Sequence, residues 1–285
     1  MIENMLLMIK KRKKIGLIQV DGKMPNLALM KLSKWYKDQG HDVTLIDISN
    51  FDFDEIFASK IFVGGSGYDL KSELPPEIEA VIPDYSLYKL GHSIGFTTRG
   101  CIRNCGFCIV REKEGLLRDV PMDWIQHQKV IVMDNNFLAS SKAKEKLQYF
   151  IDNKLKICFN QGLDIRLITD EIATLLSKVN YRDLKFKRKR LYFAFDDPSL
   201  ETIIAEKVAM LMKHGIKPQW LLFYIIVGFN STFEQDRRRM NIIDALGALP
   251  FIMLFNQTRD PQLRRFARWV NKRYYNICKF EDYHA

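Results

Sequence analysis

The sequence lacks long hydrophobic runs. Of its 285 residues 47% are hydrophobic, yet no stretch approaches about 18 consecutive apolar residues, the length needed to cross a bilayer. The apolar start "MIENMLLMI" precedes the basic run "KKRKK", which is the reverse of the order in a secretory signal. We therefore expect a cytoplasmic protein with no membrane partner. The length suits one large domain with an appendage, or two modest domains.

Cysteine is also scarce. The chain has five, and three of them lie in "CIRNCGFC" at 101–108. This crowding is typical of a metal or redox centre in a reducing compartment rather than of a disulfide framework. No second C-x2-C occurs, and Cys158 and Cys278 stand alone, so we expect both to be small buried hydrophobes.

Acidic residues are outnumbered by basic ones, 34 against 44, which gives a formal charge of +10. The excess is concentrated at 10–14, 185–190 and 264–275. Such clusters could attract an anionic partner, or they could be solvated faces of helices and loops. Because no nucleic-acid-binding module is recognisable, nucleic-acid binding stays an alternative.

The first 88 residues predict a small doubly wound α/β unit followed by a linker. Strand-like runs at 15–20, 42–48 and 60–65 flank a helical pattern that stops at Gly40. The segment 73–88 contains three prolines and is interpreted as a linker across the surface.

From residue 89 to 260 the pattern predicts a parallel sheet curled into a partial (βα)6 TIM-like barrel. The six strand candidates lie within 92–100, 129–137, 156–164, 190–197, 220–230 and 251–260. Helical patterns occur at 171–179 and 201–215. Residues 261–285 predict a C-terminal helix packed on the barrel, with Leu263, Phe266, Ala267 and Val270 inward and Arg264, Arg265, Arg268 and Lys272 outward.

Polar residues recur where each of these strands ends. They are Asp134, Asn135, Asn136, Asn160, Gln161, Asp164, Arg166, Asp196, Asp197, Asn230 and Asn256. The carboxyl ends of barrel strands build active sites, so this series predicts a polar pocket. The alternative for each residue is a helix cap or a turn.

Three cysteines suit a cubane iron–sulfur cluster in which one iron stays open. Each iron of a [4Fe-4S] cluster takes one ligand, and an open metal position is what distinguishes a catalytic site from a structural one. Gly106 lets the loop turn closely. A zinc site would need a fourth ligand, and the candidates His92, His127 and Cys158 are distant in the sequence.

The motif "CIRNCGFC" after the first of six βα units resembles the radical S-adenosylmethionine (radical SAM) superfamily, including the aromatic Phe107 before the third cysteine. The resemblance implies that Cys101, Cys105 and Cys108 hold a [4Fe-4S] cluster and that SAM chelates the fourth iron. It also implies reductive cleavage of SAM to a 5'-deoxyadenosyl radical. The electron donor would be a protein such as flavodoxin or ferredoxin.

The resemblance suggests further cofactor contacts. Asp134, Asn135 and Asn136 are candidates for binding the methionine amino end of SAM, Arg166 for its carboxylate, Asp196 for the ribose and Gly228 for the adenine. A cap, a turn or a surface salt bridge is the alternative for each of them.

The N-terminal α/β unit resembles two kinds of family member. Methylthiotransferases carry three additional cysteines there, whereas residues 1–90 contain none. Cobalamin-dependent members often carry D-x-H-x-x-G, whereas this chain has "VDGKMPN", so cobalamin is not expected. The substrate stays open, and nucleic acid is among the candidates. The alternative function is a basic nucleic-acid-binding protein stabilised by zinc or an Fe-S centre, without radical catalysis.

Overall fold

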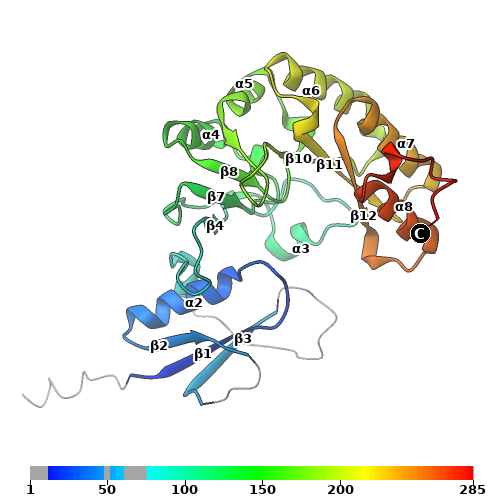
Figure 1. Cartoon of the computed structure of the whole chain (residues 1–285). Coiled ribbons are helices and arrows are strands. Elements are labelled where there is room, and N and C mark those ends of the chain that lie inside the picture. The colour runs from blue at the N-terminus through cyan, green and yellow to red at the C-terminus, as the bar shows by residue number, and fades with distance from the viewer. Residues whose placement is uncertain (1–11, 48–51, 61–75, 285) are drawn as a thin grey trace, which may run out of the picture. The chain divides into compact units, whose positions relative to one another are not determined.

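The computed structural model describes residues 12–47, 52–60 and 76–284 (Figure 1). The predicted α/β class with parallel sheets is confirmed. The chain divides into two compact units, one of residues 1–93 with 123–127 and one of residues 94–122 with 128–285. None of the described helices is long and apolar enough to cross a membrane.

The first unit is built on a three-stranded parallel sheet of order β2-β1-β3. Its elements are β1 (Lys14–Gln19), α2 (Leu27–Asp38), β2 (Asp42–Leu45), β3 (Glu55–Ser59) and the 3-10 turn η1 (Pro76–Ala80). Helix α2 begins at Asn26, whose side chain accepts from the first free backbone N–H groups. It packs Leu29 and Leu32 against Ile15 and Leu17 of β1, which forms the core of this unit.

The third strand differs from the prediction in position. We expected it at 60–65, whereas β3 ends at Ser59, and residues 61–65 lie outside the described residues. The acidic residues around Glu55 hide this strand in the sequence, because charged residues are depleted in strands in general.

The expected surface linker is wrong for its described part, residues 76–88. Ile78 joins the core of the first unit, and Asp84 and Tyr85 are buried. Asp84 accepts hydrogen bonds from Ser33 (2.6 Å) and Lys37 (2.7 Å) of α2. The prolines do not prevent this segment from packing, and it begins with the 3-10 helix η1, so it is part of the unit.

The second unit contains the remaining elements. They are β4 (Ser93–Gly95), β5 (Thr98–Arg99), α3 (Val110–Glu114), β6 (Arg118–Asp119), β7 (Lys129–Val132), η2 (Phe137–Ala139), α4 (Ala143–Asp152), β8 (Lys156–Phe159), η3 (Ile165–Leu167), α5 (Asp170–Lys178) and β9 (Asn180–Tyr181). They continue with β10 (Leu191–Ala194), η4 (Pro198–Leu200), α6 (Glu201–Lys213), η5 (Pro218–Trp220), β11 (Leu221–Val227), α7 (Phe233–Ala245), β12 (Leu249–Leu254), η6 (Phe255–Gln257), α8 (Pro261–Asn271) and η7 (Tyr274–Asn276).

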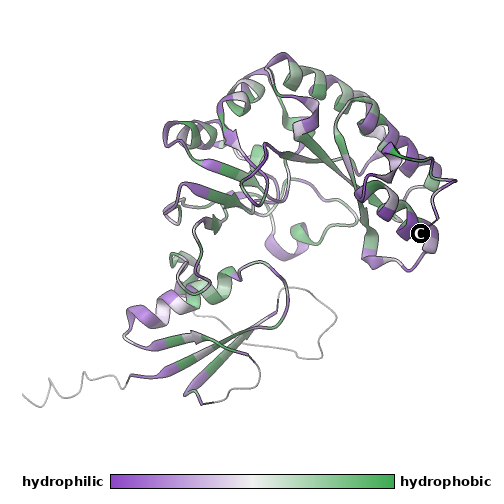
Figure 2. Ribbon diagram, in the orientation of Figure 1, coloured by the Kyte–Doolittle hydropathy of each residue, from purple (hydrophilic) through white to green (hydrophobic). Residues whose placement is uncertain are grey.

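Two sheets form the centre of this unit. One has the order β4-β7-β8-β9 and the other β10-β11-β12, and β7–β8–β9 and β10–β11–β12 pair in parallel. Beyond the end of β8, Leu163 bridges to Phe193 of β10, and its N–H donates to the Tyr192 carbonyl (2.7 Å). The strands are mainly hydrophobic, and helices α4, α5 and α6 follow one another along one side of them (Figures 1 and 2).

The helices predicted from apolar spacing are present as α5, α6 and α8. Helix α8 buries the four predicted residues together with Trp269, while Arg265 is only half exposed and lies over the Phe280 ring. Cys158 is buried as expected, but Cys278 is partly exposed, so that expectation was wrong.

The first prediction concerns Asp84. Burial alone would raise its pKa, but the hydrogen bonds from Lys37 and two serines outweigh burial and lower the pKa to about 2. An unfolded chain restores an ordinary value near 4, so the ionised Asp84 stabilises the fold above that pH. We expect Asp84→Asn to lower the free energy of unfolding by about 1–2 kcal/mol at pH 7.

This difference should shrink as the pH falls from about 4 towards about 2, because Asp84 is protonated in both states only below its folded-state pKa of about 2. Urea unfolding followed by circular dichroism at pH 7 and pH 3 measures it. Asp38→Asn is the control, because its exposed pair with Lys34 contributes under about 0.5 kcal/mol. A pH-independent difference for Asp84→Asn would contradict the prediction.

Candidate functional site

The three clustered cysteines lie in one irregular loop between β5 and α3. None forms a disulfide; Cys101 and Cys105 are half buried and Cys108 is exposed. The Cys108 N–H donates to the Cys105 carbonyl (2.9 Å), and the Cys101 N–H donates to the Gly115 carbonyl (3.3 Å). The loop therefore presents three thiols on a backbone that is tied at its base.

Glu114 closes the base of this loop. Its Oε2 accepts from the Gly100 N–H (2.9 Å), from Arg99 Nε (3.0 Å) and from Asn135 Nδ2 (3.1 Å). Gly100 has φ +74°, and a Cβ there would lie 2.3 Å from the Leu116 carbonyl oxygen, so only glycine fits. The side chain of Asn135 thus supports the loop base.

The Cys101 sulfur faces two N–H donors. They are the Arg103 backbone N–H (3.3 Å) and the Asn136 amide Nδ2 (3.7 Å). Asn136 is only 3% exposed, and its Oδ1 is buried without a hydrogen-bond partner among the described residues. Buried acceptors are normally paired, so this oxygen is an available group beside Cys101.

Asp164 pairs with two arginines next to the loop. It accepts from Arg103 Nε (3.0 Å) and from Arg166 through Nε (2.6 Å) and Nη2 (3.0 Å), and Asn136 Nδ2 lies 3.4 Å away. Burial alone would raise the pKa of Asp164, but the two arginines lower it below its ordinary value. Arg166 is therefore already paired with a carboxylate of the protein.

The electrostatics around Cys105 bring several predicted residues together. Burial raises the pKa of the Cys105 thiol, the neighbouring Cys108 and Cys101 and the carboxylate of Asp196 raise it further, and Arg166 opposes them. The segment after β8 also contacts the cysteine loop directly, because Arg103 of the loop donates to Asp164.

Asp134 turns away from this cluster. Its two carboxylate oxygens accept from the Thr97 N–H (2.6 Å) and the Thr97 hydroxyl (2.5 Å). Burial raises its pKa, and these hydrogen bonds oppose the rise. Asp134 joins the end of β7 to the segment before β5, and of the three adjacent candidates it is the least available to a ligand.

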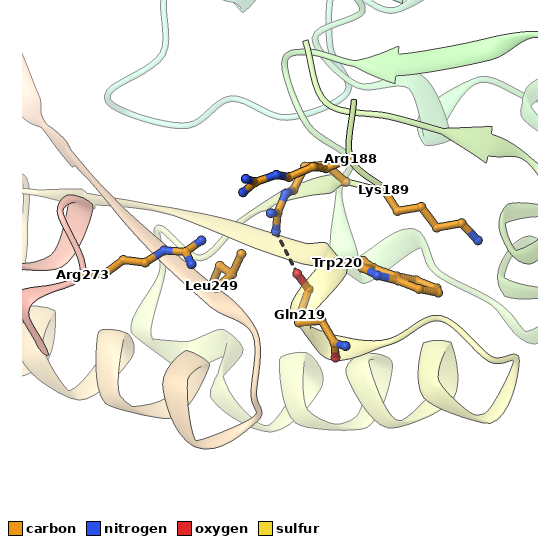
Figure 3. A pocket seen from close by; sticks show the side chains of 7 residues that line it. Arg188, Lys189, Gln219, Trp220, Leu249 and Arg273 are labelled. Carbon is orange, nitrogen blue, oxygen red and sulfur yellow. Dashed lines mark hydrogen bonds between the residues drawn. The ribbon is translucent and has the colours of Figure 1, made fainter. Parts of the chain in front are cut away.

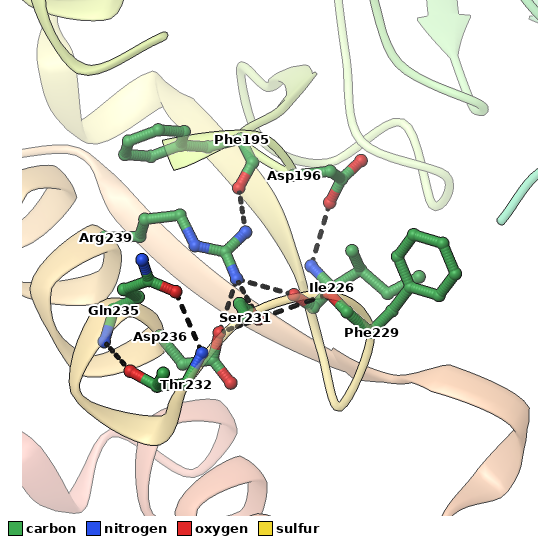
Figure 4. Close-up of polar contacts among 9 residues, drawn as sticks. All are labelled: Phe195, Asp196, Ile226, Phe229, Ser231, Thr232, Gln235, Asp236 and Arg239. Carbon is green, nitrogen blue, oxygen red and sulfur yellow. Dashed lines mark hydrogen bonds and ion pairs between the residues drawn. The ribbon is translucent and has the colours of Figure 1, made fainter. Parts of the chain in front are cut away.

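Asp196 and Gly228 lie at the ends of β10 and β11. Asp196 Oδ1 accepts from the Ile226 N–H (2.8 Å), and burial raises the pKa of Asp196 while Arg239 and Arg166 oppose the rise (Figure 4). Gly228 is exposed and has φ +80°, so its backbone turns outward directly after β11.

A buried arginine holds these two strand ends. Arg239 of α7 donates to the carbonyls of Phe195 (2.7 Å) and Ile226 (2.8 Å) and pairs with Asp236 (2.5 Å) (Figure 4). Both charged side chains are 1% exposed, and Ser231 donates to the same carboxylate (2.6 Å). The sequence alone does not reveal this clamp, because its polar residues resemble those of a solvated helix.

An aromatic series also links the loop to β11 and β12. Phe107 meets Phe229 edge to face (5.6 Å between centroids), and Phe229 meets Phe255 (4.8 Å). A Cβ on Gly106 would lie 3.3 Å from the Phe229 ring. Phe229 was not predicted, and only its place after an apolar strand could have indicated it.

Several of the other polar strand ends have local roles. Asp197 caps η4 through the Ser199 N–H (2.9 Å), and Asn230 and Asn256 have φ of +48° and +46°, as in turns. These three residues therefore act as a helix cap or as turn residues, which was the alternative to a binding role.

No three His, Cys, Asp or Glu side chains of the described ranges converge closely enough to hold one metal ion. This geometry concerns a single ion; in a cubane each thiolate binds a different iron. Comparisons of the chain with known protein-family models and with curated proteins found no match.

The second prediction tests the buried clamp. Arg239→Met leaves Asp236 buried without a counter-charge, so we expect the free energy of unfolding to fall by roughly 3–5 kcal/mol. The double variant Arg239→Met/Asp236→Leu should recover part of this loss, because it removes the uncompensated charge. Urea unfolding measures both.

The adjacent Arg238→Met is the matched control. Arg238 is on the same helix and pairs with Glu201 in solvent, so its loss should be under about 1 kcal/mol. Equal losses for the Arg238 and Arg239 variants would refute a special role for the buried pair.

Proposed function

We propose that the chain is a radical SAM enzyme that holds a [4Fe-4S] cluster on Cys101, Cys105 and Cys108. The proposal rests on the hydrogen-bonding groups around the Cys101 sulfur. Two N–H groups point at its sulfur, and the neighbouring Asn136 Oδ1 has no protein partner among the described residues. Hydrogen bonds to the ligand sulfurs are one of the means by which proteins tune an iron–sulfur cluster.

The donor set fits such a cluster. Three thiols without disulfides share one loop, and the charges of Arg166 and Asp196 act on the same sulfur, that of Cys105. When bound, the cluster would supply the one electron that cleaves SAM to methionine and a 5'-deoxyadenosyl radical. The donor of that electron would be a protein such as flavodoxin or ferredoxin, in the reducing cytoplasm.

The residues near the loop have distinct proposed tasks. Asn136 would accept a hydrogen bond from an amino group through its unpaired Oδ1, which matches the methionine end of SAM. Arg166, held by Asp164, would act on a carboxylate through its remaining N–H groups and its charge. Asp196 keeps one carboxylate oxygen beyond its bond to Ile226, and that oxygen would accept from ribose hydroxyls.

We also infer that the two parallel sheets of the second unit form an open, partial (βα)6 barrel. The bridge between Leu163 and Phe193, which links the end of β8 to β10, supports this arrangement. In such a barrel the strand ends that carry Asn136, Arg166 and Asp196 surround one mouth, where the cysteine loop also lies.

The third prediction tests the activity. After anaerobic reconstitution we expect about four irons per chain and release of 5'-deoxyadenosine when SAM and dithionite are added. Cys101→Ala should lose the cluster and the product. Cys158→Ala is the matched control and should retain both, because burial raises the Cys158 pKa to about 12 and keeps that thiol neutral.

A fully loaded cluster that yields no 5'-deoxyadenosine, with or without candidate substrates, would overturn the proposal. A single zinc ion in anaerobically purified protein would favour the alternative of a zinc-stabilised nucleic-acid-binding protein. Metal analysis and chromatography of the reaction products distinguish these outcomes.

The fourth prediction concerns Asn136. Hydrogen bonds to ligand sulfurs stabilise the reduced, more negative cluster and so raise its reduction potential. Asn136→Leu removes one such donor at Cys101, and we expect the potential to fall by a few tens of mV, since one bond contributes about 1 kcal/mol and 59 mV is tenfold for one electron.

Asn135→Leu is the neighbouring control, because the Asn135 amide donates to Glu114 instead of a cysteine. Potentiometric titration of the reconstituted variants measures the difference. An unchanged potential in Asn136→Leu, with the cluster fully loaded, would contradict the assigned contact.

A further inference from the structure

Two basic tracts that are far apart in the sequence meet at one pocket of the second unit. The pocket has a volume of about 430 Å³ and is lined by Arg188, Lys189, Arg190, Trp220, Leu249 and Arg273 (Figure 3). Its residues precede β10, precede β11 and begin β12, so it lies at the amino-terminal edge of this sheet. The cysteine loop faces the opposite edge.

The positive charges of the pocket are not neutralised by the protein. Among the described residues, none of the four lining cations forms an ion pair with a carboxylate; Arg190 donates to the Gln219 carbonyl (3.0 Å). Burial lowers the pKa of Arg190, and the nearby Arg273 and Arg188 lower it further. Asp183 is the acidic residue acting on Arg190, and one of its oxygens already accepts from the Lys187 N–H (2.8 Å).

One aromatic side chain, Trp220, lines the pocket beside these charges. Lys189 Nζ lies 4.4 Å from the centroid of the half-buried Trp220 ring, and Lys217 Nζ lies 5.6 Å from it. Tyr181 packs edge to face on the same ring. Proteins that bind single-stranded nucleic acid combine basic side chains with aromatic ones, and this pocket places four cations around one aromatic ring.

We propose that this pocket binds a single strand of nucleic acid through its backbone phosphates. Unpaired guanidinium groups are suited to bidentate contacts with phosphate. A strand is favoured over a small phosphorylated metabolite because further exposed lysines adjoin the lining residues: Lys187 precedes Arg188 in the chain, and Lys217 lies near the Trp220 ring. The site does not include the cysteine loop, so this proposal stands independently of the radical chemistry.

The fifth prediction uses Arg188→Gln/Arg273→Gln, because both side chains are exposed and their loss should not affect folding. Binding of a fluorescein-labelled RNA of about 20 nucleotides, and of the DNA of the same sequence, is followed by anisotropy over a range of salt concentrations. Wild-type affinity should fall with salt. The double variant should bind roughly tenfold more weakly near 0.1 M salt, and its salt slope should be smaller by about 1.4, or about 0.7 per lost phosphate contact.

The matched control is Arg264→Gln/Arg268→Gln, which removes two exposed arginines of α8 outside the pocket and should bind like wild type within about twofold. Circular dichroism verifies the fold of both variants. If the control variant binds as weakly as the pocket variant, the binding is non-specific electrostatic attraction, and the proposed site is wrong. If neither labelled strand binds, while inorganic phosphate alone binds the wild-type protein and not the double variant, the result would overturn the site in favour of a small-anion pocket.

Discussion

The carboxylate of Asp164 connects segments that are far apart in the sequence. It accepts from Arg103 of the cysteine loop and from Arg166 after β8, and the amide of Asn136 lies beside it. Two guanidinium groups in a half-buried place need a counter-charge, and this one carboxylate supplies it. This carboxylate therefore links the cysteine loop to the end of β8, beside the Phe107–Phe229 contact and the hydrogen bonds of Glu114.

Much of the fold follows from local patterns in the sequence. Apolar runs located β7, β8, β10, β11 and β12, and the spacing of apolar residues located α5, α6 and α8. Helix α7 was not found, because two of the residues it buries are the charged pair Asp236 and Arg239. Their burial depends on carbonyl groups of β10 and β11, which only the tertiary structure brings near. The segment at 76–88 was expected to be a surface linker because of its prolines. Prolines disfavour regular helices and strands, but they do not indicate whether a segment is buried.

For the candidate site, the sequence predicted which residues to consider but not their hydrogen-bond partners. The cysteine spacing is local and could be recognised directly, and the order of strands placed Asn136, Arg166 and Asp196 on the same side as the loop. The partners of Asn136 and Asp196 could not be derived, because hydrogen bonds between residues 28 to 35 positions apart leave no periodic signal. Asp134 illustrates the limit: its position resembles that of Asn136, yet its contacts with Thr97 give it a different role.

The base of the cysteine loop is closed by the chain's own groups. Gly100 approaches the backbone of residues 115 and 116 so closely that no side chain fits, and Glu114 fastens the same junction. The base of this loop is therefore held closed by contacts within the protein alone. If the loop holds a metal centre as proposed, these contacts would keep the base of the loop in place after the metal is removed.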